Sequence, residues 1–251
     1  MAVYDWVVFD YGGTLTTEIA GGEVDPPTGQ IMCGEILAAW FAQRGIAVAQ
    51  SVVELQKLTE EANRQSTSKP GQESLTEIWA YHTQWMRWIY RQVGVDGYIP
   101  LTELESARLY FQAEFCRRFS GTGQPSLHRT LAALQGGGAR LGVISNNAGY
   151  VSDLLATTGI HDYFEFIIDS ARVGIVKPDR AIFDLAVTNH DLSGRLLYVG
   201  DSFVHDVIGA TSAGWDVAWI TDDTTTELPA GAMRITNLAD LLPICSHKDT
   251  L

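Results

Sequence analysis

The chain has 251 residues, of which 46% are hydrophobic and 19% are charged. This composition is ordinary for a globular protein and excludes a disordered or collagen-like chain. Asp and Glu total 30 against 17 Lys and Arg, which gives a formal net charge of -13. A surface with this much negative charge repels nucleic acid phosphates and anionic lipids. We therefore expect neither nucleic acid nor a membrane as a partner.

No run of residues approaches the roughly 18 apolar positions that a membrane span requires. The first residues, MAVYD, lack the basic start of a secretory signal. The cysteines Cys33, Cys116 and Cys245 are far apart and form no CxxC pair, which argues against a disulfide framework or a cysteine zinc site. We therefore expect a reduced, cytoplasmic protein.

The first expected element is residues 5–10, DWVVFD, a short apolar run that ends in a carboxylate and is followed by YGGT. A continuous apolar run bounded by glycines is typical of a strand buried on both faces of a parallel sheet. Comparable runs predict further strands at 140–145, 164–168, 196–200 and 215–220.

Helical patterns separate these later strands, at residues 127–135, 150–158, 179–189 and 204–213. Strands that alternate with helices of this length predict βαβ units. The expected fold class is therefore α/β, a Rossmann-like doubly wound parallel sheet.

Residues 28–120 read differently, because four helical patterns follow one another without a strand, at 28–44, 51–65, 74–93 and 100–119. We interpret them as a helical unit inserted after the first strand. This predicts a core domain of residues 1–16 and 122–251 and an inserted cap domain of residues 17–121. A Gly- and Pro-containing connector is expected over 17–30, and a loose tail after Pro243.

One helix of the insert is rich in aromatic residues. Its helical spacing predicts packing inside the insert for one stripe, Ile78, Tyr81, Trp85, Trp88 and Gln92. The alternative is that some of these rings line a substrate pocket.

Chemically capable side chains follow the predicted strands. Asp10 ends the first strand, Ser145 the second, and Asp201 follows the fourth, with Asp206 five residues later and Lys177 in the loop that precedes the fourth. Ligands of an open parallel sheet bind at the carboxyl ends of its strands. Acids suit a divalent cation, and a lysine with a hydroxyl suits phosphoryl oxygens.

Four motifs carry these residues in order: VVFDYGGTL (Val7–Leu15), VISN (Val143–Asn146), VKP (Val176–Pro178) and VGDSFVHD (Val199–Asp206). In this order and at these strand ends, they resemble the motifs of the haloacid dehalogenase (HAD) superfamily of hydrolases. The resemblance covers nearly the whole chain, and the helical insert has the position and size of a C1-type cap. It implies a Mg²⁺-dependent phosphohydrolase that acts on a small organic phosphate, as a monomer or homodimer.

The resemblance also implies roles for individual residues. Asp10 would attack phosphorus and form an aspartyl-phosphate, which divides one difficult displacement into two easier ones. Mg²⁺ would be bound by Asp10, the Gly12 carbonyl, Asp201 and, directly or through water, Asp206.

The remaining implied roles concern the phosphoryl group and the loops around it. Ser145 would hydrogen-bond the phosphoryl oxygens, Lys177 would neutralise charge on Asp10 and the phosphoryl group, and Thr14 would brace the nucleophile loop. Substrate contacts are expected from Gly12, Gly13, Asn146 and Asn147.

The sequence departs from the family pattern at Gly12, where family phosphatases have a second Asp that acts as general acid and base. Such catalysis is worth roughly 10²–10⁴ in rate. Three explanations stay open: a leaving group that needs little protonation, replacement of the acid by His205 or a cap residue, or loss of most activity.

Rival functions also stay open. One is a catalytically weak, HAD-like protein that binds a phosphorylated ligand or a protein partner. A carbon-halogen hydrolase of the family needs no metal, and the acids Asp201 and Asp206 argue against it. A phosphonate hydrolase would need a cap lysine to form a Schiff base, for which the insert offers Lys57 and Lys69.

Overall fold

The computed structural model describes residues 3–15, 29–65, 75–95, 97–119, 125–147 and 149–246. Its centre is a parallel sheet with the strand order β3-β2-β1-β4-β5-β6. The strands are β1 (Trp6–Phe9), β2 (Arg140–Ser145), β3 (Phe166–Asp169), β4 (Leu196–Gly200), β5 (Asp216–Ile220) and β6 (Ala232–Ile235). The chain winds outward from β1 in one direction and then in the other, which confirms the predicted doubly wound α/β fold.

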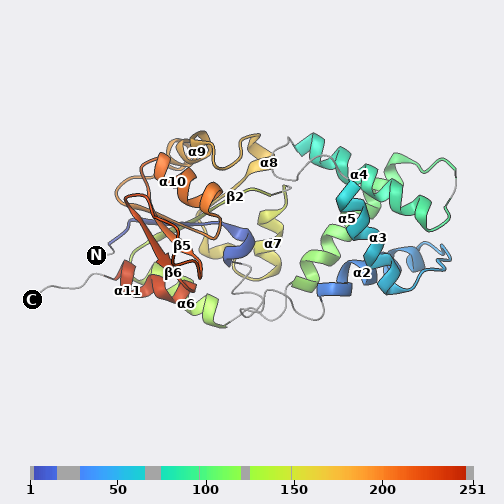
Figure 1. Cartoon of the computed structure of the whole chain (residues 1–251), viewed down its shortest axis with the longest axis horizontal. Helices are drawn as coiled ribbons and strands as arrows, with labels where there is room; N and C mark the ends of the chain where they lie inside the picture. Colours follow the sequence, from blue (N-terminus) through green and yellow to red (C-terminus); the bar gives the residue numbers. More distant parts are fainter. Residues whose placement is uncertain are drawn as a thin grey trace, which may run out of the picture.

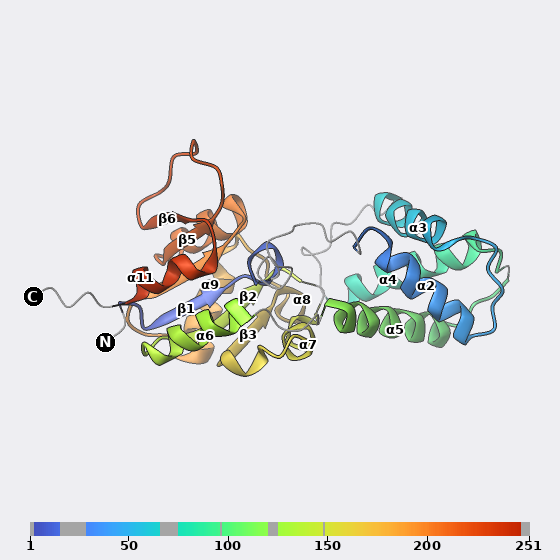
Figure 2. The same cartoon turned by 90° about the horizontal axis from the view of Figure 1, so that it is seen from below.

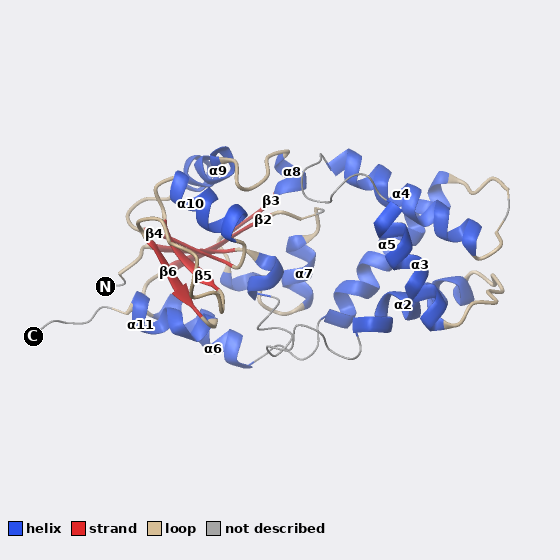
Figure 3. Cartoon of the chain, viewed as in Figure 1, coloured by secondary structure: helices blue, strands red, loops and turns tan. Residues whose placement is uncertain are grey.

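Helices cover both faces of the sheet (Figures 1 and 3). One face packs against α6 (Pro125–Gly136), α7 (Val151–Thr157) and α11 (Leu241–Cys245), and the other against α9 (Arg180–His190), η3 (Phe203–Ile208) and α10 (Gly209–Ser212). Val7 and Phe9 of β1 belong to the first hydrophobic cluster, and Trp6 and Val8 to the second. This alternation explains why the run reads as continuously apolar.

Between β1 and β2 the chain forms four consecutive helices, here called the helical unit: α2 (Gly29–Gln43), α3 (Val52–Gln65), α4 (Leu75–Gln92) and α5 (Leu101–Phe119). They share a hydrophobic cluster of their own, which includes Leu37, Phe41, Ile89 and Leu104. The predicted helices are thus present in the predicted order. The division into a core and a cap domain, with its boundaries, stays a prediction.

The buried face of α4 differs from the predicted stripe. Met86, Ile89, Tyr90 and Val93 are buried, whereas Gln92 is exposed. Including Gln92 in the stripe was wrong, because the apolar face lies one position further along the chain. Trp85 and Trp88 do pack against the cluster while remaining half-buried, and the side chains of Ile78 and Tyr81 lie outside the described residues.

The helical unit lies beyond the carboxyl ends of the strands, and α11 lies at the opposite end of the molecule (Figure 2). Contacts between α5 and α7, and between α4 and α8 (Ser170–Val173), join the helical unit to the sheet region. Most of the connector predicted at residues 17–30 lies outside the described residues, and its last two positions belong to α2.

Among the α-helices and strands of the described residues, α8, β6 and α11 were not predicted. The edge strand β6, AMRI, is only four residues long and contains a charged residue. The expectation of a loose chain after Pro243 is wrong as far as Cys245, because Pro243 lies in the first turns of α11 and Cys245 is buried. The Val3 amide donates a 3.1 Å hydrogen bond to the Cys245 carbonyl.

No helix in the described part of the chain combines the length and apolar character that crossing a bilayer requires.

Candidate active site

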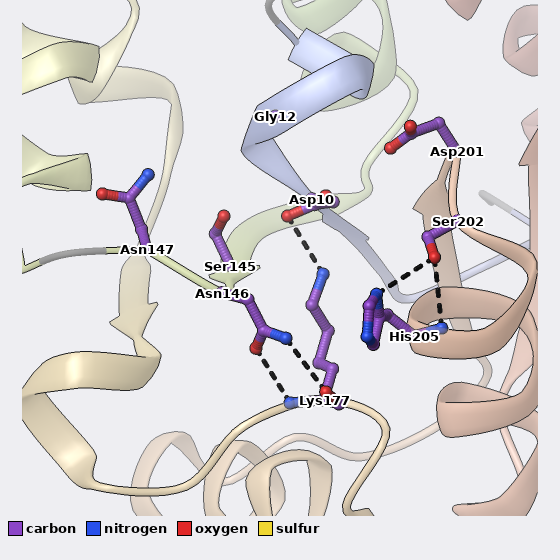
Figure 4. Close-up of a pocket in the computed structure, with 9 residues that line it drawn as sticks. All are labelled: Asp10, Gly12, Ser145, Asn146, Asn147, Lys177, Asp201, Ser202 and His205. Atoms are coloured by element: carbon purple, nitrogen blue, oxygen red, sulfur yellow. Dashed lines mark hydrogen bonds and ion pairs between the residues drawn. The ribbon is translucent and has the colours of Figure 1, made fainter. Parts of the chain in front are cut away.

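A small pocket lies at the carboxyl ends of the strands (Figure 4). The helical unit lies beyond the same ends of the strands (Figure 2). The pocket has a volume of about 240 Å³ and is lined by Asp10, Gly12, Ser145, Asn146, Asn147, Lys177, Asp201, Ser202 and His205. Residues from four separate parts of the sequence therefore meet as the strand-end argument predicted. Thr14 and Asp206 lie in the same region but do not line the pocket.

Lys177 is the centre of the charged network. Its side chain is buried, and Nζ lies 3.0 Å from Asp10 Oδ1, 2.6 Å from Asp206 Oδ1 and 2.8 Å from the Tyr198 hydroxyl. Burial alone would lower the pKa of Lys177, but the two carboxylates outweigh burial and raise that pKa. The lysine is therefore a fixed positive charge beside Asp10.

The three acids form a cluster suited to a cation. Carboxylate oxygens of Asp10, Asp201 and Asp206 lie within 4.8 Å of one another. Burial, followed by the charges of the other two acids, raises the pKa of Asp201 to about 6. Three carboxylates and one ammonium leave two uncompensated negative charges, which a divalent cation would neutralise. In addition, the buried Asp10 Oδ1 accepts no well-aligned hydrogen bond from the described residues, so this donor set fits a hard ion such as Mg²⁺.

Asp206 has a different environment from Asp201. It is fully buried, and besides its contact with Lys177 its Oδ2 accepts a 2.8 Å hydrogen bond from the Ser202 amide. Both of its oxygens therefore already have protein partners. The exposed Asp201 is better placed for direct metal ligation, and Asp206 for a contact through water.

Ser202 and His205 were underestimated from the sequence. Ser202 is the N-cap of η3, and its hydroxyl accepts a hydrogen bond from the His205 amide and lies 3.1 Å from His205 Nδ1. His205, named from the sequence as one possible substitute for the missing acid, is exposed, belongs to η3 and lines the pocket (Figure 4). A Ser directly before a helical pattern is the signal that identifies the cap.

The turn after Asp10, η1 (Tyr11–Leu15), brings β1 and β4 together. Thr14 is fully buried, and its hydroxyl lies 3.4 Å from Asp201 Oδ1. Gly13 has φ +73°, and a Cβ there would lie 2.2 Å from Asp201 Oδ2. Gly12 instead has φ −71° and ψ 130°, and a Cβ there would meet no atom within 4 Å. Only Gly13 is thus required to be glycine by its surroundings.

The two asparagines after Ser145 have different surroundings. The Asn146 amide donates to the Lys177 carbonyl at 2.9 Å, and its oxygen accepts from the Lys177 amide at 2.8 Å. It therefore joins the Ser145 loop to the Lys177 loop and also lines the pocket; the expected substrate contact stays a prediction. The backbone of Asn147 is held by the Ser170 hydroxyl, and its side chain lines the pocket.

Two further residues support the site from below. Tyr198 of β4 is buried beneath Lys177, and Trp219 of β5 donates a 2.8 Å hydrogen bond from Nε1 to the Asp201 carbonyl. Neither was identified from the sequence. Each lies inside an apolar strand run, and only the pairing of β4 with β1 and β5 places it next to the charged residues.

Comparison with known proteins gives a consistent picture. The chain is 31% identical over 151 residues to the pyrimidine 5'-nucleotidase YjjG of Escherichia coli, an alignment that covers 59% of this chain and 62% of that protein. It is 35% identical over 103 residues to the glyceraldehyde 3-phosphate phosphatase of Methanothermobacter thermautotrophicus, covering 40% of this chain and 46% of that protein. These alignments thus span between about half and two thirds of the relatives.

Among solved structures, a 2-haloacid dehalogenase from Pseudomonas syringae pv. Tomato DC3000 superimposes with a TM-score of 0.65 at 22% identity, over 96% of this chain and 98% of the other. At this identity the similarity concerns the fold. The model of the haloacid dehalogenase-like hydrolases matches residues 4–214, a span that includes every strand end described above except those of β5 and β6. The chain therefore belongs to the haloacid dehalogenase-like hydrolase family.

Proposed function

We propose that this hydrolase cleaves small organic phosphates, with Asp10 as the nucleophile and Mg²⁺ as the cofactor. The observation that carries the proposal is the ion pair between Asp10 and Lys177 at the rim of a pocket that also contains Ser145 and Asp201. The pocket volume of about 240 Å³ is below the roughly 300–1,000 Å³ of pockets that bind drug-sized ligands. The pocket therefore suits a phosphoryl group with a small part of its leaving group.

In the proposed reaction Asp10 attacks phosphorus, the bond to the leaving oxygen breaks, and an aspartyl-phosphate forms. Water then attacks phosphorus, the bond between phosphorus and the Asp10 oxygen breaks, and inorganic phosphate leaves as the Asp10 carboxylate is restored. Lys177 holds the Asp10 carboxylate in place and compensates its charge, and the Ser145 hydroxyl is close enough to Asp10 to donate to a phosphoryl oxygen. Asp10 with Asp201 and the Gly12 carbonyl would hold Mg²⁺, which supplies positive charge to the phosphoryl oxygens.

The helical unit lies opposite the pocket, and we infer that it acts as the cap. Its closure would exclude water from the site and supply contacts to the leaving group. The nucleotidase and phosphatase names of the relatives support phosphate esters as the substrate class, with the identity of the leaving group decided by the helical unit.

Gly12 bears on how the leaving group departs. Because its backbone dihedral angles are ordinary and its surroundings are open, the missing acid is not the result of a steric constraint. The three explanations from the sequence therefore make different chemical predictions: an easily departing leaving group, a substitute such as His205, or weak catalysis.

Specific observations disfavour the rival reactions. A metal-independent carbon-halogen hydrolase has no use for the cluster of three acids, Asp10, Asp201 and Asp206. For phosphonate cleavage, Lys57 is exposed on α3 and does not line the pocket, and Lys69 lies outside the described residues.

The test is a panel of phosphate esters with Mg²⁺, in which wild-type protein is compared with Asp10→Asn. The substitution keeps the shape of the side chain and removes the nucleophile, so turnover is expected to fall by orders of magnitude. Halide release from 2-haloacids in the presence of a chelator would favour the dehalogenase. If no ester is turned over above the Asp10→Asn background, the protein is a binding module and the proposed activity is wrong.

A further inference from the structure

Lys177 is surrounded by three protein groups, and one of them is not a carboxylate. The hydroxyl of Tyr198, the middle residue of β4, accepts a 2.8 Å hydrogen bond from Nζ. Asp10 and Asp206 contact the same ammonium from other directions. An ammonium has three N–H groups, so each of its donors has a direction set by the protein.

The polarity of the tyrosine contact is fixed by a second hydrogen bond. The Tyr198 hydroxyl donates at 2.7 Å to the carbonyl of Ile144, the residue directly before Ser145. Its proton is therefore committed to β2, and a lone pair is left to accept from Lys177. The hydroxyl links the lysine to the strand end that carries Ser145.

The tyrosine is itself held rigidly. Its side chain is fully buried, and its ring packs against Phe183 and Trp215 with centroid distances of 5.3 and 6.4 Å. Its backbone lies in β4 and pairs with Val8 of β1, two residues before Asp10. The hydroxyl therefore has a defined position relative to the nucleophile.

We propose that Tyr198 is a positioning residue that sets the direction of the Lys177 ammonium toward Asp10, by means of the hydrogen-bonded chain from Nζ through the Tyr198 hydroxyl to the Ile144 carbonyl. Its importance for turnover rests on the proposed function, whereas its effect on the lysine does not. Without the hydroxyl, one N–H of a buried ammonium loses its acceptor, and Nζ leaves the position that it holds beside Asp10.

The test variant is Tyr198→Phe, which retains the packed ring and removes only the hydroxyl. With p-nitrophenyl phosphate and Mg²⁺ we expect kcat to fall by about 10- to 100-fold, the range that corresponds to losing one hydrogen bond to a charged group, while KM changes little. A crystal structure of the variant is expected to show Nζ displaced from its position beside Asp10.

The helical unit provides a matched control. Tyr90 is equally buried, and its hydroxyl accepts from Trp40 Nε1 at 2.7 Å and donates to Glu103 Oε1 at 2.8 Å. Tyr90→Phe therefore also removes a doubly hydrogen-bonded hydroxyl. We expect a comparable decrease in the midpoint of urea unfolding for both variants, with kcat preserved in Tyr90→Phe.

The outcomes are distinct. An unmoved lysine in the Tyr198→Phe structure overturns the proposal, whatever the rate, and so does an equal decrease of kcat in both variants. A displaced lysine together with the specific decrease of kcat supports it. A displaced lysine in a protein whose wild type has no phosphatase activity supports the positioning role and refutes the proposed function.

Discussion

Lys177 Nζ lies 2.6 Å from Asp206 Oδ1, and neither side chain is accessible to solvent beyond 1%. Without Asp206 the ammonium keeps its ion pair with Asp10, but it loses its nearest acceptor, and the Ser202 amide loses its acceptor too; a buried donor left unsatisfied costs about 1–3 kcal/mol. We therefore expect Asp206→Ala to lower the free energy of unfolding by about 1–3 kcal/mol in urea titrations.

A second ion pair serves as the control for this prediction. Arg180 and Asp184 lie one turn apart on α9, with 3.1 Å between Arg180 Nε and Asp184 Oδ2, and both side chains are more than half exposed. Asp184→Ala is expected to cost less than about 1 kcal/mol, because water already solvates both charges. Equal losses for the two variants would contradict the assignment of a buried charge network.

Stability is expected to depend on pH through Asp201. Its pKa rises from 3.8 to about 6 on folding, so the folded protein binds more protons than the unfolded chain between these pH values. The free energy of unfolding therefore decreases as pH rises through this interval. In a chelator-containing buffer we expect Asp201→Asn to be more stable than wild type above about pH 6, by about 1 kcal/mol after solvent screening, with no advantage below pH 4. Urea unfolding at pH 4 and pH 7 measures both values.

Mg²⁺ is expected to restore the stability that repulsion among the three acids removes from the folded state. An ion that binds the folded state alone stabilises it by about 2.7 kcal/mol at a concentration 100-fold above its Kd. We expect Mg²⁺ to raise the Tm of the wild type at pH 7 and EDTA to remove the increase. Asp201→Asn is expected to abolish most of the shift. A shift of the same size in Asp201→Asn would place the ion elsewhere.

The strands, the four consecutive helices and the residues at the strand ends could be predicted because each depends on local information: apolar runs, helical spacing and a carboxylate or hydroxyl after a run. The contacts that orient those residues could not. Tyr198 reads as an ordinary core residue of LLYVG, and its role depends on β4 lying next to β1 and near Ile144 of β2. The edge strand β6 was missed because its sequence carries no continuous apolar signal.

The contacts of Asn146 likewise could not be predicted from the sequence. The sequence places it beside Ser145, which suggests a substrate contact, whereas the fold places both ends of its amide on the Lys177 backbone. Asn146→Ala is expected to cost about 1–3 kcal/mol of stability and to lower kcat through displacement of the Lys177 loop. Asn237→Ala, which removes the N-cap of η4 (Leu238–Asp240) at a residue that does not line the pocket, is expected to cost a similar 0.5–2 kcal/mol with kcat unchanged. A pure increase of KM in Asn146→Ala would instead restore the substrate-binding interpretation.

The last prediction concerns the glycine beside the nucleophile. Gly12 has backbone angles open to any residue and empty space where a Cβ would lie. With Mg²⁺ present to offset the added negative charge, we therefore expect Gly12→Asp to fold with a free energy of unfolding within about 0.5 kcal/mol of wild type. Gly13→Ala is the matched control one position away. Its Cβ would collide with Asp201 at a positive φ, and the expected loss is about 1–3 kcal/mol.

Kinetics of Gly12→Asp then separate the explanations for the missing acid. If the missing acid makes the wild type a weak catalyst, the new carboxyl group should raise kcat on ordinary alkyl phosphates by about 10²-fold or more. If the natural substrate has an easily departing leaving group, wild type should already hydrolyse acyl phosphates far faster than alkyl phosphates, and the variant should narrow that ratio. If His205 substitutes for the acid, His205→Ala should reduce activity in the wild type but not in Gly12→Asp, because the added carboxyl group makes the imidazole redundant.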